Sequence, residues 1–397
     1  MSKWEMVQLG DVCDVRDGTH ASPKYVNQGY PLVTSKNVTK GYLDFDNVSM
    51  ISQEDFDEIN KRSKVDVGDI IMPMIGTIGQ PIVVQTMERP FAIKNVALIK
   101  FSKCDNAHNE FIRIVLESPL FSAYIDRLSR GGTQKFIALK DIRSFKFPLP
   151  PLVVQLKIAG ILNRASAFIE KRKAQTAKLD LLIKSQFIQM FGDPVINPMG
   201  WEVKRLGDLV KVRSSKRVYQ REQTTSGVPF LRISDLVDKI AYNLDTNNLY
   251  ISDELYDIFL KDGVVPSVGD ILVTSRGSLG LCYVVNEHDR FYFQDGMISW
   301  LNKRDDIIDS IYLSYLFLSS EIKRQIGIAS AGSTVHYLSL SHLENFSILY
   351  PPLELQKRFA EFVKHINYHK TTLNMQITHL KKLYNALMQR CFNGEMF

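Results

Sequence analysis

The amino-acid sequence predicts an α+β protein, in which two mixed α/β domains, related by a pseudo-twofold axis, are separated by two long antiparallel helices that form a coiled coil. Three observations support this fold class. The chain repeats itself at an offset of about 200 residues, a Pro-Pro step closes each copy, and a stretch with heptad spacing follows each step. At 397 residues the chain is long enough to bury a separate core in each domain.

The repeat covers the whole chain. The passage GGTQKFIALKDIRSFKFPLPPLVVQ, which begins at Gly131, returns as GSTVHYLSLSHLENFSILYPPLELQ at Gly332. WEMVQLGDV at Trp4 returns as WEVKRLGDL at Trp201, and the pairs VGDII with VGDIL and GTIG with GSLG keep the same order. A period this long exceeds the roughly 20 to 50 residues of solenoid repeats, so it indicates a duplicated domain.

Each copy contains short β-rich runs and longer amphipathic stretches. VGDIIMPMI in the first copy and GDILVTS in the second lie between Gly, Asn and Asp turns, which predicts strands. Apolar residues recur at helical spacing over 109–129 and over 310–327, which predicts one helix in each range. The domains are therefore expected to be mixed α and β, and the pattern does not define their strand order.

A long helix is expected after each Pro-Pro step, because proline is tolerated in the first turn of a helix but blocks propagation into itself. The first helix, over 154–191, would be about 57 Å long at 1.5 Å per residue. Alternating four-three spacing defines a seam in both helices at Ile158, Leu162, Ile169, Leu179, Ile183, Phe359, Val363, Ile366, Leu373, Ile377, Leu380 and Leu387. Arg172, Thr176 and Gln186 interrupt the first seam, so either the two helices pair with each other or each lies on its own domain.

Composition and charge favour a soluble protein without a uniformly basic surface. The chain has 45% hydrophobic and 23% charged residues, four widely spaced cysteines and a net charge of +6. The positive excess falls on the predicted helices, +5 over 152–192 and +4 over 353–397, whereas 1–151 has +1 and 193–352 has −4. We expect a cytoplasmic location without disulfides, signal peptide or membrane span, since no apolar run approaches the roughly 18 residues that a span requires.

These features resemble the specificity subunit of type I restriction-modification systems over essentially the whole chain. The resemblance rests on LGD at Leu9 and Leu206, DGTHASPKY at Asp17, the GT-x-G turns, the Pro-Pro-Leu steps with the following Gln155 and Gln356, MFGDPVINPMGW and the closing FNGEMF. Each motif alone is common in proteins, but their doubled order is specific.

The resemblance implies two target recognition domains, at 1–151 and 193–352, each of which reads one half of a split, asymmetric site in double-stranded DNA. A central spacer helix at 152–192 and a C-terminal spacer helix at 353–397 would set the gap between the half-sites. They would also dock the methyltransferase subunits, two of which are expected, and restriction subunits would join this core. The chain itself would need no cofactor, and S-adenosylmethionine, ATP and magnesium are implied for its partners.

Residues that contact DNA are expected where the two copies differ, because the repeated turns build a shared scaffold. Arginine and lysine suit guanine, and asparagine and glutamine suit adenine. The candidates are Arg16, His20, Lys24, Ser35, Lys36, Asn37, Thr77, Gln134, Lys135, Arg213, Ser214, Ser215, Lys216, Arg217, Tyr219, Arg221, Arg232, Ser234, Ser275, Arg276, Thr334, His336 and Tyr337. The stretch RSSKRVYQR has four positive charges within an acidic domain, so it is either a DNA-contacting loop or a solvated loop.

The sequence supports a catalytic function less well than it supports DNA recognition. His20 has no second His, Cys or acid at metal-ligand spacing, so no catalytic or metal-binding residue is predicted. A self-contained nuclease would need Asp309 and the segment 321–323, which has the spacing of a helix with a wet face. A methyltransferase would need a Gly-rich cofactor loop and an Asn/Asp-Pro-Pro-aromatic tetrad, which 197–199 does not complete. A coiled-coil scaffold that binds only proteins remains the alternative to a DNA-reading subunit.

Overall fold

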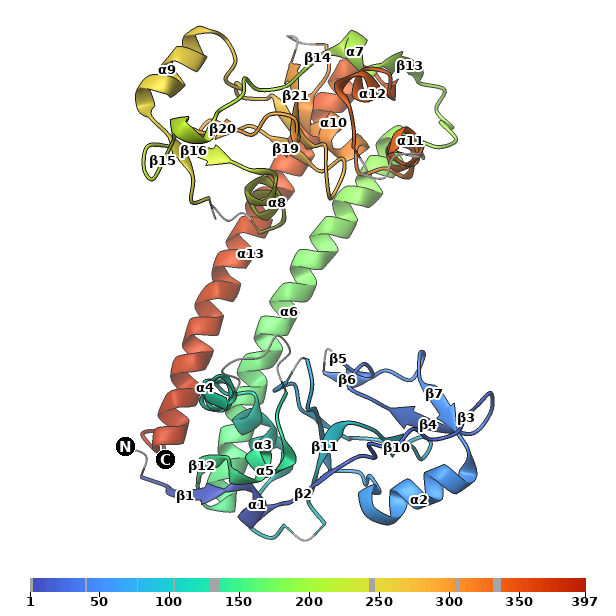
Figure 1. Ribbon diagram of the computed structural model, residues 1–397, viewed down its shortest axis with the longest axis vertical. Coiled ribbons are helices and arrows are strands. Elements are labelled where there is room, and N and C mark those ends of the chain that lie inside the picture. The colour runs from blue at the N-terminus through green and yellow to red at the C-terminus, as the bar shows by residue number, and fades with distance from the viewer. Residues whose placement is uncertain are drawn as a thin grey trace. The chain divides into compact units, whose positions relative to one another are not determined.

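The computed structural model describes residues 3–39, 41–76, 78–102, 104–128, 136–242, 247–303, 307–330 and 337–397 (Figure 1). Contacts divide the chain into two units, the first formed by Met1–Lys173 with Met375–Phe397 and the second by Ala174–Asn374. Each unit combines one copy of the sequence repeat with parts of both long helices. The domain boundaries expected at residues 151, 192 and 352 stay a prediction.

The strands of the first unit form two four-stranded sheets and two antiparallel pairs. They are β1 (Glu5–Gln8), β2 (Asp14–Asp17), β3 (Tyr25–Val26), β4 (Tyr30–Val33), β5 (Val38–Thr39), β6 (Tyr42–Leu43), β7 (Ser49–Ile51), β8 (Ile70–Pro73), β9 (Ile82–Val83), β10 (Ala92–Ile93), β11 (Val96–Lys100) and β12 (Lys146–Leu149). One sheet, β2-β11-β8-β9, is antiparallel throughout. The other, β10-β4-β7-β3, has one parallel pair, β10 with β4. The pairs are β1 with β12 and β5 with β6.

The described part of the second unit repeats the two four-stranded sheets and one of the two antiparallel pairs. Its strands are β13 (Glu202–Arg205), β14 (Val210–Arg213), β15 (Gln223–Thr224), β16 (Val228–Leu231), β17 (Tyr250–Ile251), β18 (Ile271–Thr274), β19 (Cys282–Val284), β20 (Tyr292–Phe293), β21 (Ile298–Lys303) and β22 (Ser347–Tyr350). The sheet β14-β21-β18-β19 corresponds to β2-β11-β8-β9, and β15-β17-β16-β20 corresponds to the sheet with the single parallel pair. The prediction of two mixed α/β copies is therefore confirmed, and the structure adds their strand order.

Short helices cover these sheets. In the first unit they are α1 (Leu9–Val12), α2 (Gln53–Ser63), α3 (Asn109–Leu116), α4 (Pro119–Leu128) and α5 (Leu139–Ser144). In the second they are α7 (Leu206–Leu209), η1 (Gln220–Glu222), α8 (Ile233–Tyr242), α9 (Asp253–Lys261), α10 (Ser310–Leu316), α11 (Ser320–Ser330) and α12 (Leu340–Glu344). Equivalent serines, Ser52 and Ser252, cap α2 and α9 by accepting a backbone N–H in the first turn. One difference between the copies is that α8 stands in place of the β5–β6 pair.

The expectation of one helix over 109–129 and one over 310–327 is wrong, because each range contains two helices. In the first unit α3 ends before Ser118, and Pro119 then begins α4. In the second unit Ser319 stands at the equivalent break, and its hydroxyl accepts the backbone N–H of Ile322 at the start of α11. A serine that caps a new helix and a proline in its first turn favour a break over a continuous helix.

The long helices are α6 (Leu152–Phe191) and α13 (Leu353–Asn393), and opposite ends of them meet inside each unit. In the first core, Ile158 and Leu162 of α6 cluster with Met388 and Cys391 of α13. The second core gathers Ile183, Phe187, Phe191, Phe359, Val363 and Ile366. The start of α6 therefore packs with the end of α13, and the end of α6 with the start of α13, which is antiparallel packing. The remaining seam positions, Ile169, Leu179, Leu373, Ile377, Leu380 and Leu387, are buried or half-buried.

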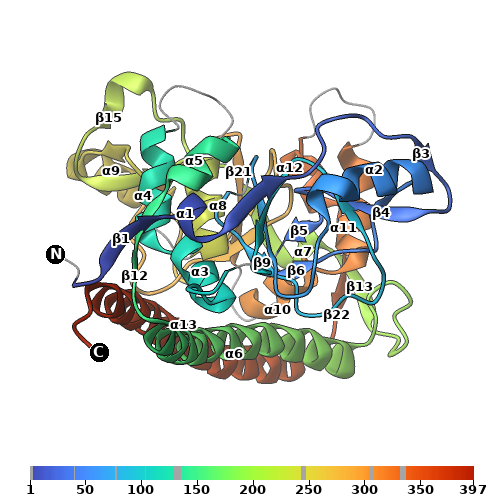
Figure 2. The ribbon, with the colours of Figure 1, turned by 90° about the horizontal axis from the view of Figure 1, so that it is seen from below.

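Helix α6 is more apolar than the sequence analysis expected, since no membrane-spanning segment was predicted there. An 18-residue window reaches a mean hydropathy of 1.4, so by length and composition α6 could cross a membrane, although 28% of that window is buried inside the protein. A helix that packs one apolar face on a core passes the same test. In the first unit α3 lies beside α6 (Figure 2). The Arg113 guanidinium of α3 donates to the Asn163 side chain of α6 at 2.5 Å.

The repeated glutamines after the Pro-Pro steps have a structural role. Gln155 is fully buried, where its amide group donates to the Pro150 carbonyl and its Oε1 atom accepts the backbone N–H of His108, next to the start of α3. In the second unit Gln356 does the same with Pro351 and Asp309, next to α10. This clamp fastens the first turn of each long helix to its own domain.

Candidate nucleic-acid interface

The candidate residues at the start of each domain include one arginine that makes the same contact in both units. Arg16 lies in β2 beside the C-terminus of α2, where its Nη1 group donates to the Arg62 carbonyl at 2.6 Å. Arg213 occupies the corresponding place in the second unit and donates to the Gly263 carbonyl, just after α9, at 3.1 Å. This shared bond anchors a helix end, so it belongs to the scaffold of both domains.

His20 lies in a polar cluster with Asp17, Asn95 and Ser35, of which Asn95 was not predicted from the sequence. Its Nε2 atom is 2.9 Å from Asp17 Oδ2, and its Nδ1 atom is 2.8 Å from Asn95 Oδ1. The hydrogen bonds to Asp17 and then to Asn95 raise the pKa of His20 above its ordinary value. The hydroxyl of Ser35 donates to the Asn95 carbonyl. Asn95 has a φ of 55°, which asparagine tolerates better than most residues. Its residue type, which suits such a turn, is the one sequence signal that could have indicated it.

The other first-domain candidates lie apart from this cluster or outside the described residues. Lys24 and Lys36 are exposed. Asn37 is buried, and its amide holds the loop that follows β4 by accepting from Thr34 and donating to the Asp44 carbonyl. Thr77, Gln134 and Lys135 are not among the described residues. The DNA contacts of these residues stay a prediction, and the structure gives Asn37 a place in the scaffold.

In the second domain, carboxylates already engage much of the positive charge of the loop after β14. Lys216 lies 3.4 Å from Asp262, and Arg217 lies 3.0 Å from Asp295. A DNA phosphate would have to compete with these exposed pairs, which contribute little to stability and exchange easily. Arg221 lies over the exposed Tyr219 ring, 5.4 Å from its centroid.

Most of the candidate serines of the second domain are buried or already form a hydrogen bond within the protein. The Ser214 hydroxyl accepts the backbone N–H of Gly296, and Ser275 is buried with its hydroxyl 2.6 Å from that of Ser299. Ser215 is also buried, and its hydroxyl has no hydrogen-bond partner within the part of the chain that the structure describes. Ser234 lies in the first turn of α8, and its hydroxyl is 3.5 Å from Asp235 Oδ1.

Arg232 forms another internal pair, since its guanidinium contacts Asp235 at 3.1 Å. The hydrogen bonds that the Arg232 guanidinium donates to Asp235 raise the pKa of Arg232. Asp235 is buried and also accepts the backbone N–H of Arg232, as Asn37 accepts that of Thr34 in the first unit. Asp235 and Asn37 are therefore equivalent scaffold residues, and Arg232 is held at the surface by one of them.

The structure brings Arg276 and Tyr337 together although 60 residues separate them in the sequence. They form an antiparallel bridge, and the Arg276 guanidinium lies 5.2 Å from the centroid of the Tyr337 ring. Arg276 is exposed, and among the described residues no carboxylate pairs with it. Thr334 and His336, which precede Tyr337, are outside the described residues.

The first unit has the same bridge with different side chains. There Ile75 pairs with Phe136, each 201 positions before its counterpart. Both bridges flank a GT-x-G type turn, whose glycines Gly76 and Gly277 have φ values of 77° and 64° that favour glycine. A shared backbone therefore presents an apolar pair in one domain and a stacked arginine in the other.

Fold and site together define a duplicated recognition protein, with a common scaffold and different exposed side chains at equivalent places. The family described as type I restriction modification DNA specificity domain matches residues 1–180 and 198–381. The chain belongs to this family, as the sequence resemblance indicated. Specificity subunits of these systems are non-catalytic. In the described part of the chain, no group of three or more His, Cys, Asp or Glu residues could hold a metal ion.

Known proteins similar to this chain cover nearly all of it. A type I restriction enzyme specificity subunit of Methanocaldococcus jannaschii, MjaIX, is 24% identical over 99% of this chain and 93% of its own length. The crystal structure of a type I restriction-modification S subunit from M. genitalium matches 98% of this chain and 96% of that chain with a TM-score of 0.56 and 15% identity. A chain from a structural study of assembly and conformational transition in a type I R-M system matches 99% and 98%, with a TM-score of 0.57 and 19% identity. These solved structures support the fold.

Proposed function

We propose that this chain reads a split, asymmetric site in double-stranded DNA, with one half-site for each domain. The observation that carries the proposal is the pair of equivalent bridges, Ile75 with Phe136 and Arg276 with Tyr337. Shared bonds such as those of Arg16 and Arg213 keep the two scaffolds alike. Different side chains on one backbone are what two half-sites of different sequence require.

The chemistry of the Arg276–Tyr337 pair suits base recognition. An arginine fork can donate two hydrogen bonds to the O6 and N7 atoms of guanine in the major groove. The Tyr337 ring restricts the guanidinium before binding, which lowers the entropy lost when the contact forms. Ile75 and Phe136 offer apolar contact instead, which suits the methyl group of thymine. We therefore assign guanine recognition to the second domain at this position.

Two domains on one frame gain selectivity that one domain lacks. Each base pair contributes about 1–3 kcal/mol of discrimination. Half-sites about 34–36 Å apart lie on the same face of B-DNA. A continuous helix of 40 residues, such as α6, is about 60 Å long at 1.5 Å per residue, which leaves room for two domains and a gap.

The long helices also offer surfaces for protein partners, and we propose that methyltransferase subunits dock there. Leu156 and Phe168 of α6 and Met375 of α13 are exposed in the first unit. Leu181 of α6 and Tyr368 of α13 are exposed in the second. Several exposed apolar side chains on one element favour a protein interface. Partner subunits would then supply S-adenosylmethionine, ATP and magnesium chemistry, and restriction subunits would join them in the cytoplasm.

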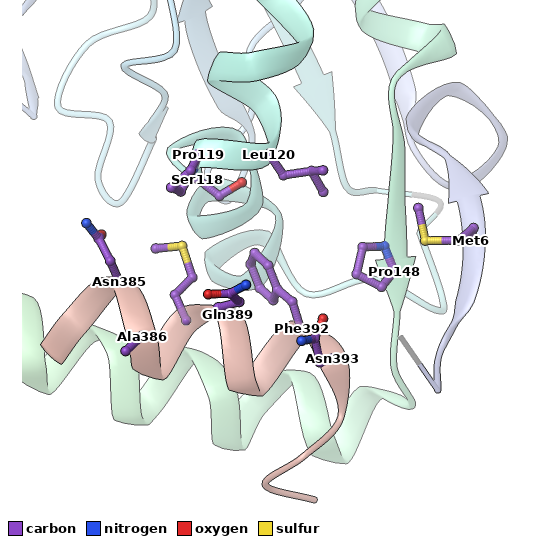
Figure 3. Close-up of a pocket in the computed structure, with 11 residues that line it drawn as sticks. Met6, Ser118, Pro119, Leu120, Pro148, Asn385, Ala386, Gln389, Phe392 and Asn393 are labelled. Atoms are coloured by element: carbon purple, nitrogen blue, oxygen red, sulfur yellow. The ribbon is translucent and has the colours of Figure 1, made fainter. Parts of the chain in front are cut away.

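The first unit has an apolar groove that extends such a surface. It measures about 630 Å³ and lies between the β1–β12 pair, the start of α4 and the end of α13. Met6, Leu120, Pro148 and Phe392 line it, as Figure 3 shows. We assign it to the same methyltransferase contact, because it continues along α13 beyond the exposed apolar residues of that helix.

The proposal is tested by binding to duplex DNA with and without a methyltransferase subunit. A filter-binding selection from random duplexes should yield a split consensus with two different halves. Sequence-independent binding, or none in the assembled complex, would instead favour the scaffold that binds only proteins.

A further inference from the structure

Two histidines on α13 form a cluster that the proposed function does not use. His365 and His369 lie four residues apart, so both side chains project from the same side of the helix. Their Nε2 atoms are 3.1 Å apart, and the two rings meet at an interplanar angle of 83°. Both residues are exposed and lie within the second unit.

We propose that His365 and His369 bind one divalent transition-metal cation, such as Zn²⁺, Ni²⁺ or Cu²⁺. With metal–nitrogen bonds of about 2.0–2.1 Å, two nitrogens 3.1 Å apart subtend an angle of about 100° at the ion. This angle lies between those of octahedral and tetrahedral coordination. The two Nε2 atoms share a hydrogen bond in the structure, and a metal ion would replace it. Each ring would then carry its proton on Nδ1 and turn its Nε2 lone pair toward the ion.

Ligand chemistry defines the class of cation. Imidazole nitrogen suits zinc, nickel and copper, whereas magnesium and calcium prefer oxygen ligands. Because no third His, Cys, Asp or Glu joins the pair among the described residues, the protein supplies two ligands. Water, or a ligand from a molecule that contacts this face of α13, fills the other positions.

The surrounding helix holds the pair in place before a metal arrives. Phe359, Val363 and Ile366 lie buried on the other side of α13, so this stretch cannot rotate without opening the second core. Lys370 follows His369 directly and would repel a cation, but its ammonium group is bound by Asp180 of α6. Because the backbone that carries both rings is fixed, mainly the side chains lose freedom on binding. The Asp180 contact also reduces the repulsion between Lys370 and the cation.

Titration of the untagged full-length protein with NiCl₂ and ZnCl₂ tests this site, with heat of binding and melting temperature as the two measurements. A metal that binds only the folded protein raises the melting temperature, and the rise grows with the logarithm of its affinity. His365→Ala and His369→Ala should each lower the affinity at least 10-fold and remove the rise in melting temperature. His379→Ala is the matched control, since His379 is an exposed histidine on the same helix with no partner histidine one turn away, and it should change neither. MgCl₂ should have no effect.

The histidine variants decide the outcome, because the Cys13 and Cys104 thiols, 3.3 Å apart, are a second soft-ligand pair in the chain. If the wild type binds neither nickel nor zinc, the site does not exist. Equal binding by the wild type and His369→Ala would also overturn the proposal, since the metal would then lie elsewhere. Neither result would affect the proposed DNA recognition, which uses other residues.

Discussion

Equivalent residues of the two domains fall into two groups. Gln155 and Gln356 make the same bonds in both units and maintain the scaffold. Ile75 and Arg276 stand at the same bridge with different chemistry. Substitutions in the first group should therefore affect stability, and those in the second group should affect DNA sequence preference.

Arg276→Ala should change the preferred base at one position of one half-site. Loss of a two-bond contact to guanine removes about 1–3 kcal/mol of discrimination, which is about 5- to 150-fold. Arg276→Lys keeps the charge but not the fork, so it should lose the base preference while retaining most of the affinity. Binding selections over random duplexes measure both. A uniform loss of affinity with unchanged preference would mean that Arg276 contacts phosphate.

Gln155→Ala should destabilise the first unit by about 2–3 kcal/mol, because it leaves the half-buried His108 N–H and the buried Pro150 carbonyl without the Gln155 side chain as a partner. Urea unfolding followed by circular dichroism measures the change. Gln376→Ala, at an exposed position of α13, is the control and should have almost no effect. Equal stability of the two variants would show that the clamp contributes nothing.

Residue type alone predicts part of the candidate site. Arginine and asparagine suit bases, which is why Arg276 and Asn37 were both chosen. Whether a side chain reaches solvent depends on strand pairing, which brings Arg276 to Tyr337 and buries Asn37 under its own loop. Asn95 was missed because its role depends on a backbone conformation and on contacts with His20, which lies 75 positions away.

At the scale of single elements, the long helices carry two kinds of apolar residue. Leu162 is buried in the first core, whereas Leu181 is 62% exposed. Leu162→Ala should cost about 2–5 kcal/mol of unfolding free energy, through lost burial and a cavity. Leu181→Ala should change stability by less than about 0.5 kcal/mol.

The same two variants distinguish stability from docking. Leu181→Ala should weaken co-purification with the methyltransferase subunit, since it removes an exposed apolar contact from α6. Denaturation curves and a pull-down measure the two effects separately. Full retention of the partner by Leu181→Ala would place the docking surface elsewhere.

Long elements were easier to predict than short ones. The heptad spacing after each Pro-Pro step predicted α6 and α13 because 40 residues of pattern outweigh a few polar interruptions. Over 109–129 the pattern continued across Ser118 and Pro119, so the break between α3 and α4 was missed. Strands of two residues, such as β3 and β10, carry too little pattern to place in a sheet.

At the scale of the whole molecule, the chain ends resemble the link between the two copies. In the first unit the Trp4 indole donates to the Cys391 carbonyl at 3.3 Å, and the Lys3 N–H donates to the Asn393 carbonyl. In the second unit the Trp201 indole donates to the Phe191 carbonyl at 2.9 Å across a continuous link. In the first unit the two ends of the chain therefore take the place that the continuous segment between α6 and β13 takes in the second unit.

A circular permutant should consequently fold. In this variant Phe397 is joined to Met1 through one or two glycines, and the chain is opened between Pro194 and Gly200. The first unit then has the continuous link, and the second unit has the chain ends. We expect a melting temperature near that of the wild type and the same DNA half-sites, measured by thermal denaturation and binding selection. Failure of several such permutants to fold would contradict the equivalence of the two links.

The central claim is that two recognition domains read a split site whose gap is set by the long helices. Four residues inserted after Lys173 of α6 and four after Asn374 of α13 lengthen both helices by about 6 Å and keep their apolar faces nearly in phase. At about 3.4 Å per base pair, the gap should grow by one or two base pairs while both half-sites stay the same. Two-residue insertions, which turn each helix by about 200°, should prevent assembly.

Methylation mapping of genomic DNA from cells that carry the wild type or the four-residue variant, each with its partner subunits, measures this directly. We expect the same two half-sites in both strains and a longer gap in the variant. An unchanged gap, or altered bases in either half-site, would contradict the claim that these helices set the spacing between two independent recognition domains.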